Sequence, residues 1–362
     1  MTATRYGAAT EVTVLNIHRR KKILFLLAGF LGLAALGALA VYLFAFAPNT
    51  TGYEGEKSVF IPPESSLDEA VDSLSSSGII RYGSTLSIMG RVTGWGGQIK
   101  AGHYRIGEGA SNYDILDKMR RGLQSPVRLT IPPGSRPEVV AAVAARSMAF
   151  GPEEFLDTLR DTSLARSMGT DTTHLFGFML PETYFFYWLT EPSEVIEKVK
   201  EEFDRRYEEY APDSSDGGTL SPGEAATLAS IVEWETAIPE ERPRVAGVYF
   251  NRLKRGWRLQ ADPTVQYAIL EREGSKRRLF FRDYEIQHPY NTYLFGGLPP
   301  GPITNPSPAS LKAVLEPESH SYFYFVARGD GGHIFSRTLR EHSRNANNYR
   351  NLMRRQRAAQ GG

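Results

Sequence analysis

Two glutamates, Glu233 and Glu235, lie two residues apart in the segment ASIVEWETA. In a helix that starts at Ser221, counting about 100° per residue places them on opposite faces. Glu235 continues an apolar stripe made of Leu228, Ile231 and Val232. Apolar neighbours, the C-terminal end of the helix and any second acid would each raise the pKa of Glu235. A carboxyl that stays protonated near neutral pH can serve as a general acid, whereas Glu233 should meet solvent or a polar partner.

The helix that positions these glutamates has clear boundary signals. Ser221 suits the N-cap, Pro222 the first helical position, and Glu224 completes a capping box. The dipeptide at 238–239, Ile-Pro, ends the helix. A structural alternative is open for Glu235, namely an ion pair with an arginine such as Arg242 or Arg244.

Candidate substrate contacts follow further along the chain. Gln260, in RLQADPTVQYA, has no capping role to explain it and offers an amide to a polar group of a substrate. Tyr290, Asn291 and Tyr293, in YNTY, offer aromatic faces and polar donors, although this segment also suits a simple turn. Asp262 precedes a proline, so a helix N-cap is at least as well supported for it as a substrate contact.

Composition excludes several other classes of function. The 362 residues carry a formal net charge of +1 and no cysteine, so no disulfide framework, thiolate zinc site or cysteine nucleophile is available. The seven histidines form no His-x-x-x-His pair, and no Gly-rich lysine motif could cradle a phosphate. We expect no metal, no cofactor and no nucleic-acid partner.

One segment predicts a membrane anchor. Residues 23–47 contain no charge, and about 20 apolar residues suffice to span a bilayer. Residues 1–22 carry Arg5 and the basic run 19–22 against a single acid, which predicts a cytoplasmic tail and places residues 48–362 outside the cytoplasmic membrane. Cleavage of a signal peptide after Ala45-Phe46-Ala47 is the alternative, but signal cores usually have about 7 to 15 residues.

Beyond the membrane segment, the sequence predicts an α+β protein in two parts. After a short linker containing Pro and Gly, residues 57–128 form a small strand–helix–helix–strand module, with strands near 57–61 and 102–106 and helices near 67–74 and 113–119. Residues 129–352 form a larger mixed α+β domain. A hairpin is expected in it at 322–326 and 333–335, turning through Asp-Gly-Gly.

Several long motifs occur in one order: AGHYRIGEGAS, LPETY, ASIVEWETA, VAGVYFNRLKRGWRLQADPTVQYA, YNTY, GLPPGPI, YFYFV and GGHIFS. Together they resemble the endolytic murein transglycosylase family of bacterial cell-wall enzymes. The resemblance implies a single-pass inner-membrane protein with a LysM-like murein-binding module at 57–128 and a catalytic domain at 129–352. It also implies one essential glutamate, in the E-x-E-T motif, which is Glu235 here.

The same resemblance implies the reaction. The enzyme would cleave the β-1,4 bond between N-acetylmuramic acid and N-acetylglucosamine without water and leave a 1,6-anhydro end. This would limit the length of nascent glycan strands, beside peptidoglycan synthases as partners. A hydrolytic muramidase stays open, with a second carboxylate among Glu233, Glu240, Glu241 and Asp262. A non-catalytic murein-binding scaffold for cell-wall synthases is the other alternative.

Overall fold

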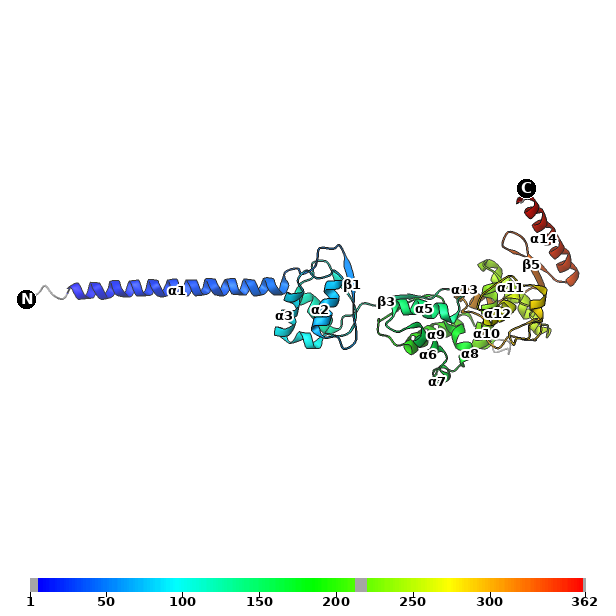
Figure 1. Cartoon of the computed structure of the whole chain (residues 1–362), viewed down its shortest axis with the longest axis horizontal. Helices are drawn as coiled ribbons and strands as arrows, with labels where there is room; N and C mark the ends of the chain where they lie inside the picture. The colour runs from blue at the N-terminus through cyan, green and yellow to red at the C-terminus, as the bar shows by residue number, and fades with distance from the viewer. Residues whose placement is uncertain (1–5, 212–219, 361–362) are drawn as a thin grey trace, which may run out of the picture. The chain divides into compact units, whose positions relative to one another are not determined.

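The structure, a computed structural model, describes residues 6–211 and 220–360 (Figure 1). It divides into two compact units, residues 1–126 and 127–362, which are described separately. Sequence analysis placed the boundary after residue 128. The predicted mixed α+β class is confirmed, because helices predominate and the strands form three two-stranded antiparallel sheets.

The first unit begins with one long helix, α1 (Tyr6–Phe46). Its segment Lys21–Phe46 is long and apolar enough to cross a membrane, and the most apolar window is not buried against the rest of the chain. The helix starts well before the predicted span 23–47, because the sequence has no proline before Pro48 to interrupt it. Most of the predicted tail 1–22 is therefore helical, and its residues 1–5 lie outside the described residues.

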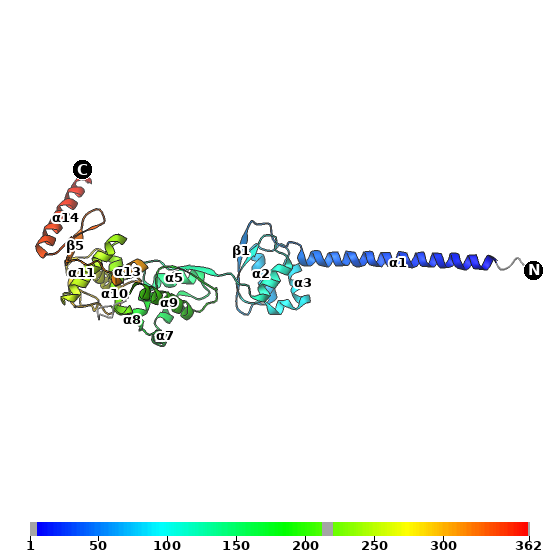
Figure 2. The same cartoon turned by 180° about the vertical axis from the view of Figure 1, so that it is seen from behind.

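A small module follows α1 in the same unit (Figure 2). Strands β1 and β2 pair in antiparallel fashion, with Val59 opposite Tyr104. Ser66 and Ser111 cap α2 and α4 through capping boxes. The predicted strands and both predicted helices are present, and the unpredicted α3 supplies the second helix between the strands. The elements are β1 (Glu56–Ile61), α2 (Leu67–Ser76), α3 (Gly83–Thr93), η1 (Trp95–Gln98), β2 (Gly102–Gly107) and α4 (Asn112–Arg121).

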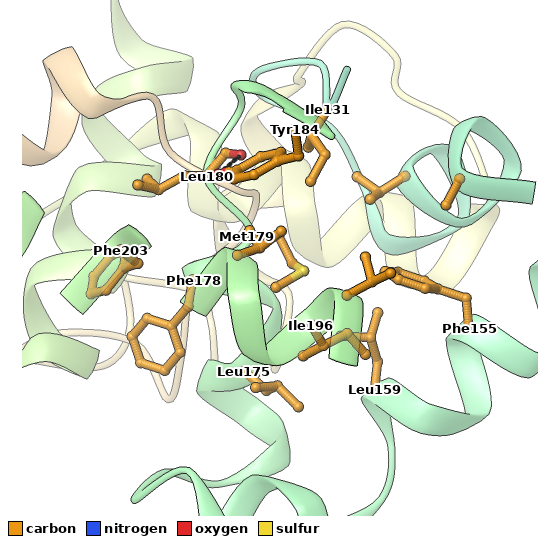
Figure 3. Packing of buried hydrophobic residues seen from close by; sticks show 14 of the residues in the cluster. Ile131, Phe155, Leu159, Leu175, Phe178, Met179, Leu180, Tyr184, Ile196 and Phe203 are labelled. Atoms are coloured by element: carbon orange, nitrogen blue, oxygen red, sulfur yellow. Dashed lines mark hydrogen bonds between the residues drawn. The ribbon is translucent and has the colours of Figure 1, made fainter. Parts of the chain in front are cut away.

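The second unit opens with a helical layer against a short sheet. Its core is apolar and aromatic, and Figure 3 shows Phe155, Phe178 and Phe203 packed with Met179 and Ile196. Strand β3 pairs with β4 in antiparallel fashion. The elements are β3 (Val127–Thr130), α5 (Pro137–Ser147), α6 (Pro152–Leu159), α7 (Thr162–Ser167), α8 (Thr172–Leu175), η2 (Phe176–Phe178), β4 (Thr183–Phe186) and α9 (Pro192–Tyr210).

The rest of this unit surrounds helix α10. The predicted hairpin is confirmed as β5 and β6, with Phe325 opposite Phe335. The elements are α10 (Pro222–Glu235), η3 (Pro239–Glu241), α11 (Arg242–Lys254), α12 (Asp262–Glu273), η4 (Phe281–Glu285), α13 (Pro308–Leu315), β5 (Tyr324–Ala327), β6 (His333–Ser336) and α14 (Leu339–Gln360).

Helix α10 is the central helix of this part of the unit. The predicted capping box is present, since Ser221 accepts from the backbone N–H of Glu224 and the Glu224 carboxylate accepts from the N–H of Ser221. All residues from Ala225 to Val232 are buried, and α11, α12 and α13 pack against the helix. The sequence prediction of one apolar and one polar face is therefore too simple. Burial on all sides holds the middle of α10, residues 225–232, in place.

Candidate active site

Glu235 is the last residue of α10, and its side chain is half-buried. The Tyr249 hydroxyl donates a hydrogen bond to Glu235 Oε2 at 3.1 Å. Burial, first, and the charge of Asp262, second, raise the pKa of Glu235 to about 7, although the Tyr249 hydrogen bond and the Arg252 charge act to lower it. The carboxyl therefore holds a proton over much of the neutral pH range and can release it within that range.

This environment agrees with the pattern read from the sequence. Burial and a second acid both raise the pKa of Glu235, which also lies at the negative end of the α10 dipole. The alternative prediction, a structural ion pair between Glu235 and Arg242 or Arg244, is wrong. Arg242 pairs with Glu233 at 3.1 Å, and Arg244 pairs with Glu318 at 3.0 Å.

The second acid, Asp262, lies at the start of α12. The N-cap of that helix is Ala261, which makes no side-chain capping bond, so the capping interpretation of Asp262 is wrong. Asp262 is instead the first helical residue, and its carboxylate accepts hydrogen bonds from the hydroxyls of Tyr293, at 2.6 Å, and Tyr284, at 3.5 Å. These hydroxyls hold the carboxylate in place beside Glu235.

Two hollows share these carboxyl groups. Both Glu235 and Asp262 line each of them. The first, of about 490 Å³, is also lined by Glu233, Trp234, Ala237, Pro263, Gln266, Lys276 and Leu279. The second, of about 380 Å³, is also lined by Arg252, Gln260, Tyr284, Tyr293, Tyr324, Phe325, Leu339 and His342. The two carboxyl groups therefore lie where the hollows meet, with aromatic side chains on either side.

Two of the predicted sugar contacts, Gln260 and Tyr293, line the second hollow with Glu235. Gln260 is exposed and has a φ of 48°, in the left-handed region. This conformation costs a residue other than glycine about 1 to 2 kcal/mol. The Gln260 backbone N–H donates to the Thr292 carbonyl at 3.1 Å, which helps to hold the strained turn. Strain of this kind is common where a side chain is held out toward a ligand.

The other two predicted contacts lie elsewhere. Tyr290 lines neither hollow, and its ring packs 4.6 Å from that of Tyr267. Asn291 is fully buried, and its side-chain amide donates to the backbone carbonyls of Tyr284 and Ile286. The structure therefore places Asn291 as a residue that shapes the loop carrying Tyr293. In this arrangement it presents no surface to a sugar.

The remaining candidates for a second carboxylate are differently placed. Glu233 borders the first hollow, but its oxygens accept from Arg242, Ser307 and Ser310. Glu241 pairs with His333 at 2.7 Å, and Glu240 is exposed. Only Asp262, among the four, lines both hollows.

Sequence reasoning missed Tyr249, Arg252 and Tyr284. Tyr249 and Arg252 are three residues apart on α11, a spacing that places two side chains on one helix face. That spacing was the one available signal for them, whereas Tyr284 reaches the site from the short helix η4. Within residues 6–211 and 220–360, no group of three or more His, Cys, Asp or Glu side chains could hold a metal ion.

A protonatable carboxyl beside a second carboxylate, in a cleft lined by aromatic residues, is typical of enzymes that cleave glycans by acid–base chemistry. Comparison with known proteins identifies the family. The model of the YceG-like family matches residues 59–348, and the chain belongs to this family.

Characterised relatives include two endolytic murein transglycosylases. The one from Bacillus subtilis is 29% identical over 304 residues, which are 80% of this chain and 83% of the relative. The one from Streptococcus pneumoniae D39 is 26% identical over 348 residues, which are 87% of this chain and 63% of the relative. A crystal structure of a yceG-like protein from Listeria monocytogenes has a TM-score of 0.55 at 29% identity, covering 80% of this chain and 98% of that one.

Proposed function

We propose that this chain is a membrane-anchored endolytic murein transglycosylase, a lyase, with Glu235 as its acid and base. The observation that carries the proposal is a carboxyl with a pKa of about 7 at the junction of two hollows. The names of the Bacillus and Streptococcus relatives support the same reaction class.

In the first step, protonated Glu235 gives its proton to the oxygen between N-acetylmuramic acid and N-acetylglucosamine. The bond from this oxygen to C1 of the muramic acid breaks, and positive charge develops at C1 and the ring oxygen. The Asp262 carboxylate, held by Tyr293 and Tyr284, stabilises that charge from the same cleft, together with the N-acetyl group of the substrate.

In the second step, the Glu235 carboxylate takes the proton of the muramic acid 6-hydroxyl. The 6-oxygen attacks C1 and closes a 1,6-anhydro ring, so no water is consumed. Glu235 ends the cycle protonated, as it began. One residue can play both parts because a pKa near 7 makes its two protonation states similar in free energy at neutral pH.

The two hollows support cleavage within a strand. Since Glu235 borders both, sugar units can lie on either side of the bond that breaks. Trp234, in the first hollow, and Tyr324, in the second, offer aromatic surface to sugar faces. Gln260 and Tyr293 are our candidates for polar contacts to the acetamido and hydroxyl groups.

The other parts of the chain fit the same function. We propose that α1 anchors the protein in the cytoplasmic membrane with residues 48–362 outside, and that the 57–128 module binds murein in the manner of a LysM domain. Cleavage next to the membrane would limit the length of strands as synthases make them.

Product mass tests the proposal most directly. Purified murein is digested with the full chain in detergent, in water enriched in oxygen-18, and the fragments are analysed by mass spectrometry. We expect fragments one water lighter than reducing-end fragments, with no oxygen-18 at the new end. Reducing-end fragments carrying one oxygen-18 would indicate a muramidase, and intact murein with bound protein would indicate a scaffold.

Asp262→Asn provides a test of the electrostatics at the site. Removing this charge removes one of the causes that raise the pKa of Glu235, while burial, the largest cause, stays. The acid form of Glu235 is lost as pH rises through its pKa. The alkaline limb of kcat/KM should therefore move from about pH 7 to lower pH, and kcat should fall.

Tyr249→Phe is the matched variant, in which the pH profile should move in the opposite direction. The Tyr249 hydroxyl lowers the pKa of Glu235 by a hydrogen bond to the charged form, so its loss should move the alkaline limb to higher pH. If the alkaline limb moves in the same direction in both variants, or does not move in either, a group other than Glu235 controls the pH profile.

A further inference from the structure

The junction between α1 and the small module is not a free linker. The carbonyl of Phe44, in the last turn of α1, accepts a hydrogen bond from Asn112 Nδ2 at 2.9 Å. Ala45 packs against the apolar core of the module, and the Phe46 ring lies 5.1 Å from the Tyr113 ring. The end of the helix is therefore part of the module.

Two buried asparagines secure this junction. Asn49 and Asn112 are each 3% exposed, and Asn49 Nδ2 donates to Asn112 Oδ1 at 2.7 Å. Asn49 also exchanges two hydrogen bonds with the backbone of Tyr82, at 2.9 and 3.0 Å. Buried amides that are fully bonded in this way have one favourable arrangement, which makes the junction stiff. The short linker predicted after residue 47 is therefore held against the module at its start, where Pro48 also bridges to Ser111 and Thr50 to Ile80.

Helix α3 lies beside the junction. Its N-terminal side is tied to the junction through Tyr82, which bonds Asn49. At its other end Trp95 lies 5.4 Å from Tyr113, the ring that touches Phe46. Figures 1 and 2 show α3 at the end of the module where α1 enters. Both ends of α3 are therefore held close to the end of α1.

Helix α3 exposes two apolar side chains one helical turn apart, Ile88 at 52% and Val92 at 82%. Tyr82, just before the helix, is also exposed, and the Arg120 guanidinium lies 4.5 Å from the ring of the partly buried Trp95. We name as the α3 face the surface centred on Ile88 and Val92 and bordered by Tyr82, by Trp95 of η1 and by Tyr113 of α4.

The length of the span brings the α3 face to the bilayer. The uncharged run 23–47 is about 38 Å long as a helix, whereas the hydrocarbon core is about 30 Å thick. The last turns of α1 therefore lie among the lipid headgroups, and the module starts within three residues of them. Tyr and Trp favour this interface, where aliphatic side chains reach the acyl boundary and arginine meets phosphate.

We propose that the α3 face rests in the headgroup region of the bilayer, so that anchor and module form one rigid, membrane-seated unit. The inference depends on the proposed membrane anchoring by α1. It goes further, because it assigns the module a lipid-contacting surface and a fixed orientation. It also makes cleavage after Ala47 unfavourable, since the lost segment includes the Phe44 carbonyl and Ala45, which the module uses.

The chain has no cysteine, so single nitroxide labels can be attached to the full-length protein without further changes. The label positions are Ile88→Cys and Val92→Cys on the α3 face, Leu33→Cys near the middle of the uncharged run 23–47, and Pro63→Cys in the exposed loop after β1. Each protein is reconstituted in phosphatidylethanolamine and phosphatidylglycerol vesicles. Power saturation with oxygen and with a nickel chelate then gives the depth of each label.

We expect position 33 to read as deep, position 63 as aqueous, and positions 88 and 92 at headgroup depth, with an oxygen-to-nickel accessibility ratio several-fold above that of position 63. Readings at 88 and 92 equal to that at 63, with 33 deep, would overturn the lipid contact while leaving the anchor intact. An aqueous reading at 33 would overturn the anchor itself. Ile88 and Val92 lie outside the core, so these substitutions should leave the module folded.

Discussion

Glu235→Gln is expected to lower the rate of murein cleavage by on the order of 10³-fold. The amide keeps the shape of the side chain and can still accept from the Tyr249 hydroxyl, but it cannot give a proton to the leaving oxygen or take one from the 6-hydroxyl. The measurement is the initial rate of release of soluble fragments from purified murein, with binding to murein measured in parallel. Binding should be retained because the substitution removes no aromatic or polar contact in either hollow.

The stability of the Glu235→Gln variant shows whether its loss of activity comes from misfolding. The pKa of Glu235 is about 7 in the folded protein, above the ordinary carboxyl value of 4.5. Between these values the unfolded chain loses a proton that the folded chain keeps, so native stability contributed by this group falls as pH rises through this range. Gln does not titrate. The free energy of unfolding of the variant should therefore be similar to the native value at pH 4 and greater at pH 8.

Activity and the free energy of unfolding, measured together, distinguish a catalytic role of Glu235 from a structural one. A variant that is inactive and less stable at pH 8 would indicate a structural role for Glu235, and one that cuts murein at the native rate would exclude it as the acid. Loss of activity with a gain in stability is expected only where a residue is kept for catalysis at a cost to folding.

Helix α10 was predictable because its signals are local. Ser221, Pro222 and Glu224 define the first turn through bonds within four residues, and counting from that turn places Glu233 and Glu235 on different sides of the helix. The β5–β6 hairpin has the same kind of signal, a glycine-rich turn between alternating residues. By contrast, α3 contains two glycines and several β-branched or small polar residues, and its stability comes from packing in the module.

The partners of Glu235 were not predictable, since they come from segments far apart in the chain. The sequence motif Asp-Pro at 262–263 favours a helix cap, and only the approach of Tyr284, from η4, and Tyr293, from the loop that follows, shows that the Asp262 carboxylate is used elsewhere. Asn291 is the reverse case, a predicted substrate contact that the structure uses within the fold. Its residue type suits a sugar contact, but backbone carbonyls of the same loop occupy its amide. Burial and partner choice are tertiary properties, which residue type does not determine.

Glu233→Ala is expected to cost about 3 to 5 kcal/mol in the free energy of unfolding, measured by urea denaturation. The Glu233 side chain is 8% exposed and pairs with Arg242, whose side chain is 11% exposed. Glu233 also accepts from the backbone N–H of Ser307 at 3.0 Å and the Ser310 hydroxyl at 2.7 Å, at the N-terminus of α13. The alanine variant leaves the buried Arg242 without its carboxylate partner, with Ser307 Oγ as its remaining acceptor, and removes the acceptor of the Ser307 N–H and of the Ser310 hydroxyl.

Two further variants establish whether the cost comes from the ion pair. Glu240→Ala removes an exposed glutamate from the neighbouring turn and should change stability by less than about 0.5 kcal/mol. Glu233→Ala combined with Arg242→Met should recover part of the loss, because the unpaired guanidinium is also removed. Purely additive losses would mean that Glu233 acts through the α13 N-terminus alone. Recovery of stability in the double variant would show that the two glutamates of E-x-E-T have separate roles. Glu233 holds α10, α11 and α13 together, whereas Glu235, two residues on, faces the cleft with the Tyr249 hydroxyl as its hydrogen-bond partner.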